Sequence, residues 1–161
     1  MSDPRPTAAR FDPSYGVARD ASGAKRLPWS AAEARLAAAR GYWVCTTRAD
    51  GRAHAMPVWG LWLDGALWFG TARASVKGRN LARSPEVTVH LGSVDEVVLL
   101  EGQAAEQHEL DDFLAAYEAK YGLRPPLDDG TVVYAVRPRT ALTWLEADYT
   151  STVVRWVFDR G

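Results

Sequence analysis

The sequence predicts a small, mostly β protein, an antiparallel barrel with two or three helices packed outside it. Seven or eight short segments are rich in β-branched and aromatic residues, and most of the connections between them are short. Tight-turn signals such as Asp64-Gly65 separate neighbouring segments. The chain has 161 residues, the usual length of one domain. We therefore expect a single domain over residues 28–161, preceded by an N-terminal arm over residues 1–27.

The charge balance argues against two classes of partner. The chain carries 19 Lys and Arg residues against 20 Asp and Glu residues. A net charge of -1 offers no electrostatic reason to bind nucleic acid or an anionic membrane surface. The sequence also lacks an apolar run of about 20 residues and the apolar centre of a signal peptide. We expect a cytoplasmic protein.

The first elements follow from local signals. Residues 1–27 contain scattered Pro, Arg, Asp and Gly without a helical or strand period, which predicts a mobile or draped arm. Ser30-Ala-Ala-Glu33 has the pattern of a capping box, so we expect a helix from about Ala31 to Ala39.

Two hairpins should follow this helix. Strands are expected at 42–48 and 52–63, joined by Asp50-Gly51, and at 66–71 after Asp64-Gly65. The Asp64-Gly65 pair is typical of a type I′ turn, in which both central residues have positive φ. Pro57 has no N–H to donate, so its strand should lie at an edge of the sheet or bulge there. Backbone groups beside Pro57 would then be free to meet a ligand.

The second half of the chain alternates strands and helices. Ser75 is placed to cap a short helix that runs to Ala82, and Gly122 should end a second helix that begins at Leu110. The remaining strands are expected at 86–91, 96–105, 131–137, 141–146 and 152–158.

The segment after the second hairpin is a candidate anion site. Its polar residues are Thr71, Arg73, Ser75, Lys77, Arg79 and Asn80. Free amides and the helix dipole favour negative charge at a helix N-terminus, which suits a phosphate group. A capped helix at a hairpin exit would use the same residue types without binding anything, so both interpretations stay open.

Three tryptophans lie on the hairpin that precedes this segment. Trp59, Trp62 and Trp68 could line a flat wall for a ring-shaped ligand, or they could belong to the core or to a dimer interface. We expect at least one of them to be a core or interface residue. With a wall at one end and an anion site at the other, an elongated ligand with a flat ring and a phosphate would fit.

Other chemistries find little support. The lone Cys45 lies in an apolar run and is interpreted as a small core residue. His54, His90 and His108 are widely separated, which argues against a metal site. The glycine-rich dinucleotide and triphosphate fingerprints and the nucleophile elbow are absent, and no catalytic residue is assigned.

Several blocks, taken in order, resemble the pyridoxamine 5′-phosphate oxidase-like superfamily. They are Gly51-Arg52-Ala-His54-Ala-Met56-Pro57-Val58-Trp59, Asp64-Gly65, Phe69-Gly-Thr71, Ser75-Val-Lys77-Gly-Arg79-Asn80-Leu81, Ser84-Pro85 and Glu101-Gly102. Within that superfamily the chain most resembles the flavin and deazaflavin oxidoreductases that include F-420-dependent enzymes. The resemblance covers about residues 30–158.

The resemblance implies a split β-barrel that forms a homodimer with two cofactor sites at the subunit interface. By match of motif, Met56, Pro57 and Val58 would contact the flavin-type ring. Arg155 and Trp156 would reach the cofactor of the partner subunit. The phosphate side would be bound by Thr71, Ser75, Lys77 and Asn80, with Arg73 and Arg79 as additions.

The function that follows is hydride transfer between coenzyme F-420 and a small or medium conjugated organic substrate. The paired Arg and His with which the oxidase proper binds the phosphate of its substrate are missing, so pyridoxal phosphate synthesis is not expected. One alternative is an FMN-dependent oxidase or reductase with the same fold. The other is a flavin- or haem-binding module without turnover.

Overall fold

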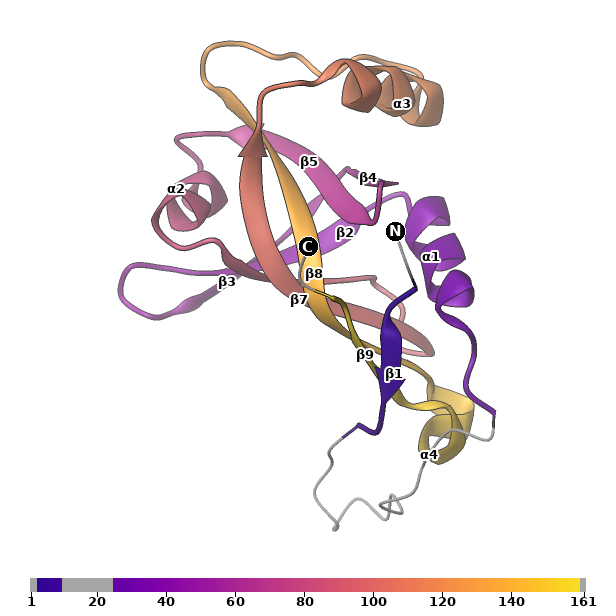
Figure 1. The fold of residues 1–161 in the computed structure, drawn as a ribbon. Helices are drawn as coiled ribbons and strands as arrows, with labels where there is room; N and C mark the ends of the chain where they lie inside the picture. Colours follow the sequence, from indigo (N-terminus) through magenta and orange to yellow (C-terminus); the bar gives the residue numbers. More distant parts are fainter. Residues whose placement is uncertain (1–2, 10–24, 160–161) are drawn as a thin grey trace.

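The computed structural model describes residues 3–9 and 25–159, which form one antiparallel nine-stranded sheet with helices around it (Figure 1). The strands are β1 (Arg5–Thr7), β2 (Tyr42–Thr47), β3 (Ala53–Val58), β4 (Leu61–Leu63), β5 (Ala66–Ala72), β6 (Glu86–His90), β7 (Glu96–Gln107), β8 (Thr131–Leu145) and β9 (Val154–Val157). The helices are α1 (Trp29–Ala38), α2 (Val76–Arg83), α3 (Asp111–Tyr121), the 3₁₀ turn η2 (Glu146–Asp148) and α4 (Tyr149–Thr152).

The long strand β8 organises the sheet. One of its edges pairs with β7 from Val133 to Leu145, and the other edge pairs first with β5 and then with β9. The register with β7 shifts where Gly102 faces Pro138, so β8 carries a bulge there. A bulge bends a strand and increases its twist, which lets the two halves of β8 serve different neighbours.

This continuity corrects the expectation of separate strands at 131–137 and 141–146. Pro138 lies between the two expected strands and cannot donate to a ladder. In the structure Pro138 lies in the bulge, opposite Gly102. A Cβ added to Gly102 would lie 2.1 Å from the carbonyl oxygen of Arg137. Only glycine allows this close approach of the two backbones.

The strand expected at 52–63 is also different, because it breaks at Trp59-Gly60 into β3 and β4. The N–H of Gly60 donates to the hydroxyl of Tyr121 at 3.0 Å, and its carbonyl accepts from Lys120 at 3.2 Å. These partners on α3 replace ladder partners at the break. β3 pairs only with β2 within the described chain, so the expected edge position of Pro57 is confirmed.

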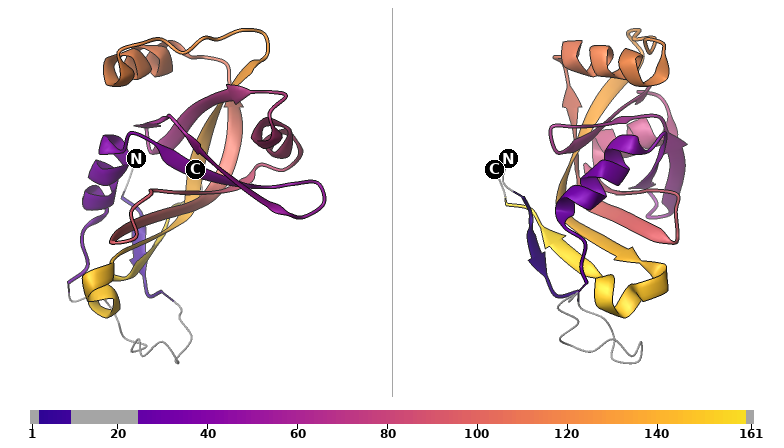
Figure 2. Two further views of the ribbon diagram at one scale, coloured as in Figure 1. Left: turned by 180° about the vertical axis from the view of Figure 1, so that it is seen from behind. Right: turned by 90° about the vertical axis from the view of Figure 1, so that its right-hand side faces the viewer.

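The main core fills the interior between the curved sheet and α1. Its fully buried members include Leu36, Tyr42, Val44, Leu67 and Phe69. A second cluster packs α3 against the outer side of β5 and β8, through Leu61, Phe113, Tyr117 and Val133. In Figure 1 and in the left view of Figure 2, α1 and α2 lie on opposite sides of the molecule, while α3 covers one end.

The N-terminal arm is more ordered over residues 3–9 than its composition predicts. β1 pairs with β9 in the register Arg5 with Val157 to Thr7 with Arg155, and the hydroxyl of Thr7 donates to the carbonyl of Arg155 at 3.0 Å. Short strands without periodicity give no local signal, and here the edge of β9 supplies the partners. Residues 10–24 of the expected arm lie outside the described residues.

Two helix boundaries differ from the local signals. α1 begins at Trp29 after Pro28, and no side chain caps it, so the expected capping box of Ser30 is wrong. The first turn begins two residues earlier than expected, at Trp29, whose side chain is buried in the core. A strand was expected to begin at residue 152, but residues 149–152 form α4. The Thr152 hydroxyl stabilises this helix by hydrogen bonds to the backbone of Leu145 and Asp148.

Cys45 was expected to be a core residue, but the structure does not place it in the core. It is only half-buried, because it alternates with the buried Val44 and Thr46 along β2 and so faces the outer side of the sheet. Burial still raises the pKa of its thiol. None of the helices formed by the described residues has the length and apolarity needed to cross a lipid bilayer.

Candidate functional site

The junction between β5 and α2 is the candidate anion site. Ser75 is the N-cap of α2, as predicted, and its hydroxyl accepts from the N–H of Gly78 at 3.1 Å. Thr71, at the end of β5, lies 3.1 Å from the same hydroxyl. The first backbone bond of the helix runs from the N–H of Arg79 to Ser75. The amides of Val76 and Lys77 precede it and have no acceptor within the helix.

Gly78 allows α2 to sit close to the strand it follows. A Cβ at this position would lie 2.6 Å from the carbonyl oxygens of both Ala72 and Arg73. Any larger residue would push the helix away from the β5 exit, because contacts this short do not occur in proteins. The glycine therefore keeps the amide end of α2 beside Thr71 and Ser75.

Lys77 supplies the positive charge of this site. Its ammonium forms no hydrogen bond or ion pair with any other residue of the described chain, although the side chain is half-buried. Burial lowers the pKa of Lys77, because the charged form loses water without gaining a partner. An anion at the start of α2 would supply that partner.

Arg73 and Arg79 make other contacts. The guanidinium of Arg73 forms two hydrogen bonds to the carboxylate of Glu106 on β7. This pairing lowers the pKa of Glu106 and raises that of Arg73. Arg79 donates to the carbonyl of Ala74 in the turn before α2. Both arginines flank the candidate anion site, but Lys77 has no partner among residues 3–9 and 25–159.

Asn80 connects α2 to the sheet. Its side chain is buried, and its amide donates to the hydroxyl of Thr46 at 3.0 Å. That hydroxyl lies 3.4 Å from Nδ1 of His54 and 3.5 Å from the His54 carbonyl. Burial lowers the pKa of His54, and the nearby charges of Arg48 and Lys77 lower it further.

Sequence analysis missed this role of His54. His54 was weighed as a metal ligand and quoted in the family blocks, but it was given no role beside the anion site. Among residues 3–9 and 25–159 no three His, Cys, Asp or Glu side chains are grouped to hold a metal ion. The available signal was its spacing of two from Met56, which places both on one face of a strand. The link to Asn80 depends on the pairing of β2 with β3 and could not be seen in the sequence.

The expected ring-contacting residues lie on the edge strand β3. Met56 is 44% exposed, Pro57 is exposed, and Val58 is buried. Met56 pairs with Val44 and His54 pairs with Thr46, so these pairs share the face of the sheet on which Asn80 sits. The structure therefore brings Met56 to the same side as the anion site.

Arg155 and Trp156 are placed elsewhere. Arg155 pairs with Leu142 on β8, whereas Thr71 pairs with Val132. Ten residues of strand correspond to roughly 30 Å, so Arg155 is remote from the anion site of its own chain. Trp156 is 4% exposed, and its indole N–H donates to the hydroxyl of Thr143 at 2.8 Å. Its side chain belongs to the core.

The three hairpin tryptophans do not form one wall. Trp62 packs against Trp29 of the main core, and Trp68 packs against Phe113 under α3. Trp59 is 46% exposed and stacks on Tyr121 at a ring distance of 4.8 Å. Trp68 pairs with Leu61 and therefore faces away from Trp62, while the break at Gly60 places Trp59 outside both strands.

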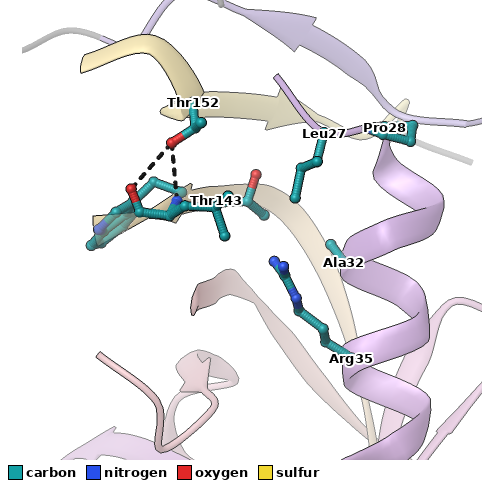
Figure 3. A pocket seen from close by; sticks show the side chains of 8 residues that line it. Leu27, Pro28, Ala32, Arg35, Thr143 and Thr152 are labelled. Atoms are coloured by element: carbon teal, nitrogen blue, oxygen red, sulfur yellow. Dashed lines mark hydrogen bonds between the residues drawn. The ribbon is translucent and has the colours of Figure 1, made fainter. Parts of the chain in front are cut away.

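A small cavity between α1 and the end of β8 is too small for a flavin. It measures about 10 Å³, enough for about one water molecule. Figure 3 shows Arg35 and Ala32 of α1 on one side of it and Thr143 on the other. The hydroxyl of Thr152 bonds to both backbone groups of Leu145 beside it, at 3.0 and 3.3 Å.

Comparison with solved structures shows the fold. An F420 reductase aligns with a TM-score of 0.58 at 22% identity, over 68% of this chain and 94% of that one. A putative pyridoxamine 5′-phosphate oxidase from Listeria innocua aligns with a TM-score of 0.59 at 18% identity, over 71% and 95%. A heme binding protein from Mycobacterium smegmatis aligns with a TM-score of 0.55 at 22% identity, over 78% and 60%.

A family model gives the family directly. Among curated proteins no match was found. The model described as pyridoxamine 5′-phosphate oxidase matches residues 29–145, well over half of the chain. The expected split barrel, with β8 shared between two sets of strands and the sheet not fully closed, is thereby confirmed. The chain belongs to the pyridoxamine 5′-phosphate oxidase family.

Proposed function

We propose that this protein is an oxidoreductase that transfers a hydride between coenzyme F-420 and a small or medium conjugated organic substrate. The observation that carries the proposal is the half-buried Lys77 at the start of α2, which has no partner among the described residues. The family binds flavins, and one structural neighbour is described as an F420 reductase. A phosphate-bearing flavin or deazaflavin matches this site.

The residues of the chain fit such a cofactor. Lys77 and the free amides at the start of α2 would hold the phosphate, with the hydroxyls of Thr71 and Ser75 beside them. When bound, the ring system supplies the hydride chemistry, and the protein orients the ring and excludes water. Met56, Pro57 and Val58 would border the ring, since β3 offers an exposed edge next to the anion site.

Three further residues support the phosphate side at a distance. Asn80 fixes the Thr46 hydroxyl, which in turn holds the ring of His54. The guanidinium of Arg73 balances the negative charge of the Glu106 carboxylate, so that this carboxylate does not repel an anion. Arg79 ties down the turn that leads into α2 through the carbonyl of Ala74.

The working form in this proposal is a cytoplasmic homodimer with cofactor sites shared by two subunits. Arg155 is too far along β8 to meet a ligand at Lys77 of its own chain. It would contribute only across a subunit interface. Trp156 would act indirectly, by fixing β9 through its bond to Thr143.

A second candidate is an FMN-dependent oxidase or reductase with the same fold. The anion site carries no feature that separates the phosphate of FMN from that of F-420. A non-catalytic flavin- or haem-binding module is the third candidate, and one structural neighbour is described as a heme binding protein.

Spectroscopy of the purified full-length protein separates these candidates. A yellow preparation would indicate FMN, and a Soret band would indicate haem. A colourless preparation should be titrated with F-420 and with FMN in parallel. Binding of F-420 at micromolar concentration is the expected outcome, and failure of both cofactors to bind at that concentration would reject the proposal.

A further inference from the structure

A second cavity lies on the opposite side of the molecule from α2. It measures about 290 Å³ and is bordered by the N-terminal arm, α1, the β4–β5 turn and the residue after β9. This volume is close to the lower limit of small-molecule sites, and it is far larger than a single water requires. The cavity is bordered by α1, whereas the proposed cofactor site is at the start of α2. Figure 1 shows these two helices on opposite sides of the molecule.

Aromatic rings form the inner wall of this cavity. Trp29 makes edge contacts with Phe158 at a ring distance of 5.1 Å and with Trp62 at 6.4 Å. All three residues line the cavity. Their mutual packing fixes the rings before any ligand arrives, which lowers the entropy cost of binding. The faces of aromatic rings attract cations.

Carboxylates form the rim. Glu33 on α1 is half-buried, while Asp3 and Asp64 are exposed. None of these three carboxylates forms an ion pair with another residue in the part of the chain that is described. Arg137 approaches Asp64, but it reaches only the backbone carbonyl, at 3.5 Å. The rim therefore presents negative charge that the described residues leave unbalanced.

Trp29 adds a hydrogen-bond donor that has no acceptor. The residue is 3% exposed, and its indole N–H bonds to no other described residue. Trp29 lines this cavity, which makes its N–H a candidate donor to a ligand hydroxyl.

We propose that this cavity binds a small organic ammonium ion that carries a hydroxyl group, as amino alcohols do. The rings of Trp29, Trp62 and Phe158 would contact the cationic head, and Glu33 would balance its charge. The hydroxyl would accept from the indole N–H of Trp29. The inference is independent of the proposed cofactor, because none of these residues belongs to the site at α2.

Choline is the probe that tests the proposal, with its neutral carbon isostere as the matched ligand. Calorimetric titration of the full-length protein should show choline binding at concentrations below about 10 mM and no binding of the isostere. Glu33→Gln should weaken choline binding by about tenfold, because it removes the charge and keeps the shape. Glu109→Gln makes the same charge change on an exposed loop and should leave the affinity unchanged.

Three outcomes would overturn the proposal. They are no choline binding at that concentration, equal binding of the neutral isostere, and unchanged affinity in a folded Glu33→Gln protein. Circular dichroism and thermal melting of each variant establish that it is folded. Trp62→Leu gives a second test of the aromatic wall, since loss of one ring should weaken choline binding while F-420 binding stays as in the wild type.

Discussion

Lys77 is the residue on which the proposed cofactor site depends most. Its ammonium is half-buried and has no anionic partner in the described chain, so a phosphate would gain a charge-assisted hydrogen bond there. Lys77→Ala should weaken F-420 or FMN binding by about 1 kcal/mol or more, roughly fivefold or more in Kd. Fluorescence or calorimetric titration measures the change.

A matched control uses another of the chain's three lysines. Lys25 lies at Asp148, on the surface and away from α2. Lys25→Ala removes the same charge, so it should leave the affinity close to that of the wild type. Equal affinities of the wild type and Lys77→Ala would remove Lys77 from the site.

His54 should respond to pH and to the anion. Burial and the charges of Arg48 and Lys77 lower its pKa in the folded protein, so folding favours neutral His54. The unfolded chain then binds more protons between the two pKa values, and the free energy of unfolding falls as pH drops below about 6.5. In His54→Gln this fall should be smaller, which denaturant titrations at several pH values would detect.

The same pH series includes a control and a ligand arm. His108→Gln, which removes an exposed loop histidine, should leave the pH dependence of His54 in place. Inorganic phosphate bound near Lys77 would offset the positive field and raise the pKa of His54, as followed by its imidazole NMR signals. A pH dependence that is identical in wild type and His54→Gln would contradict this interpretation.

At the scale of elements, α2 depends on Gly78. An alanine is a better helix former by about 1 kcal/mol, yet its Cβ would lie 2.6 Å from two backbone carbonyl oxygens. Gly78→Ala should therefore destabilise the protein by about 1–3 kcal/mol and displace α2 from the β5 exit. Chemical denaturation measures the loss, and cofactor titration should show weaker binding.

Gly70 offers the control for this substitution. It lies in the neighbouring strand β5, and a Cβ there would meet only a methyl group of Val133, at 4.0 Å. Gly70→Ala should change the free energy of unfolding by less than about 1 kcal/mol. A Gly78→Ala protein as stable as Gly70→Ala would show that α2 can shift without cost.

For the whole molecule, the proposed homodimer makes a prediction about shared sites. Lys77→Ala and Arg155→Ala should each weaken cofactor binding, because the two residues would meet only across the interface. In a mixed dimer of the two variants, one site combines both substitutions and the other has neither. About half of the sites in purified mixed dimers should therefore bind with wild-type affinity.

Light scattering on the same samples checks the assembly. The expected mass is twice the 17.7 kDa of one chain. Exposed apolar side chains support an interface, since Trp43 and Met56 are 38% and 44% exposed. A protein that stays monomeric at micromolar concentration with cofactor bound, or mixed dimers without recovered sites, would reject the shared site.

Local signals in the sequence were sufficient for the Asp64-Gly65 turn, the cap of α2 and the end of α3, but not for the start of α1, where the expected capping box of Ser30 does not form. Asp64 and Gly65 have φ of 51° and 69°, as a type I′ turn requires, and Gly122 ends α3 in the left-handed region. Ser75 caps α2 as predicted. Each of these features depends on residues within three or four positions, so the chain specifies it without reference to the rest of the fold.

Resemblance of ordered motifs went further and predicted the family and the split barrel, both of which the comparisons confirm. It did not predict how the side chains would be distributed. Trp156 was expected at a cofactor and lies in the core, and the hairpin tryptophans were candidates for one wall and lie in three environments. Motif spacing gives position along the chain, but burial depends on what packs from elsewhere.

The sequence by itself therefore determined the barrel class, the tight turns and the capped helix that follows β5. Only the tertiary structure decided that β8 is one bent strand, that His54 joins Asn80 through Thr46, and that Lys77 has no partner in the described chain. The reason is the range of the interactions. Turns and caps form between near neighbours, whereas strand pairing, burial and the electrostatics of a site come from residues that meet only when the chain folds.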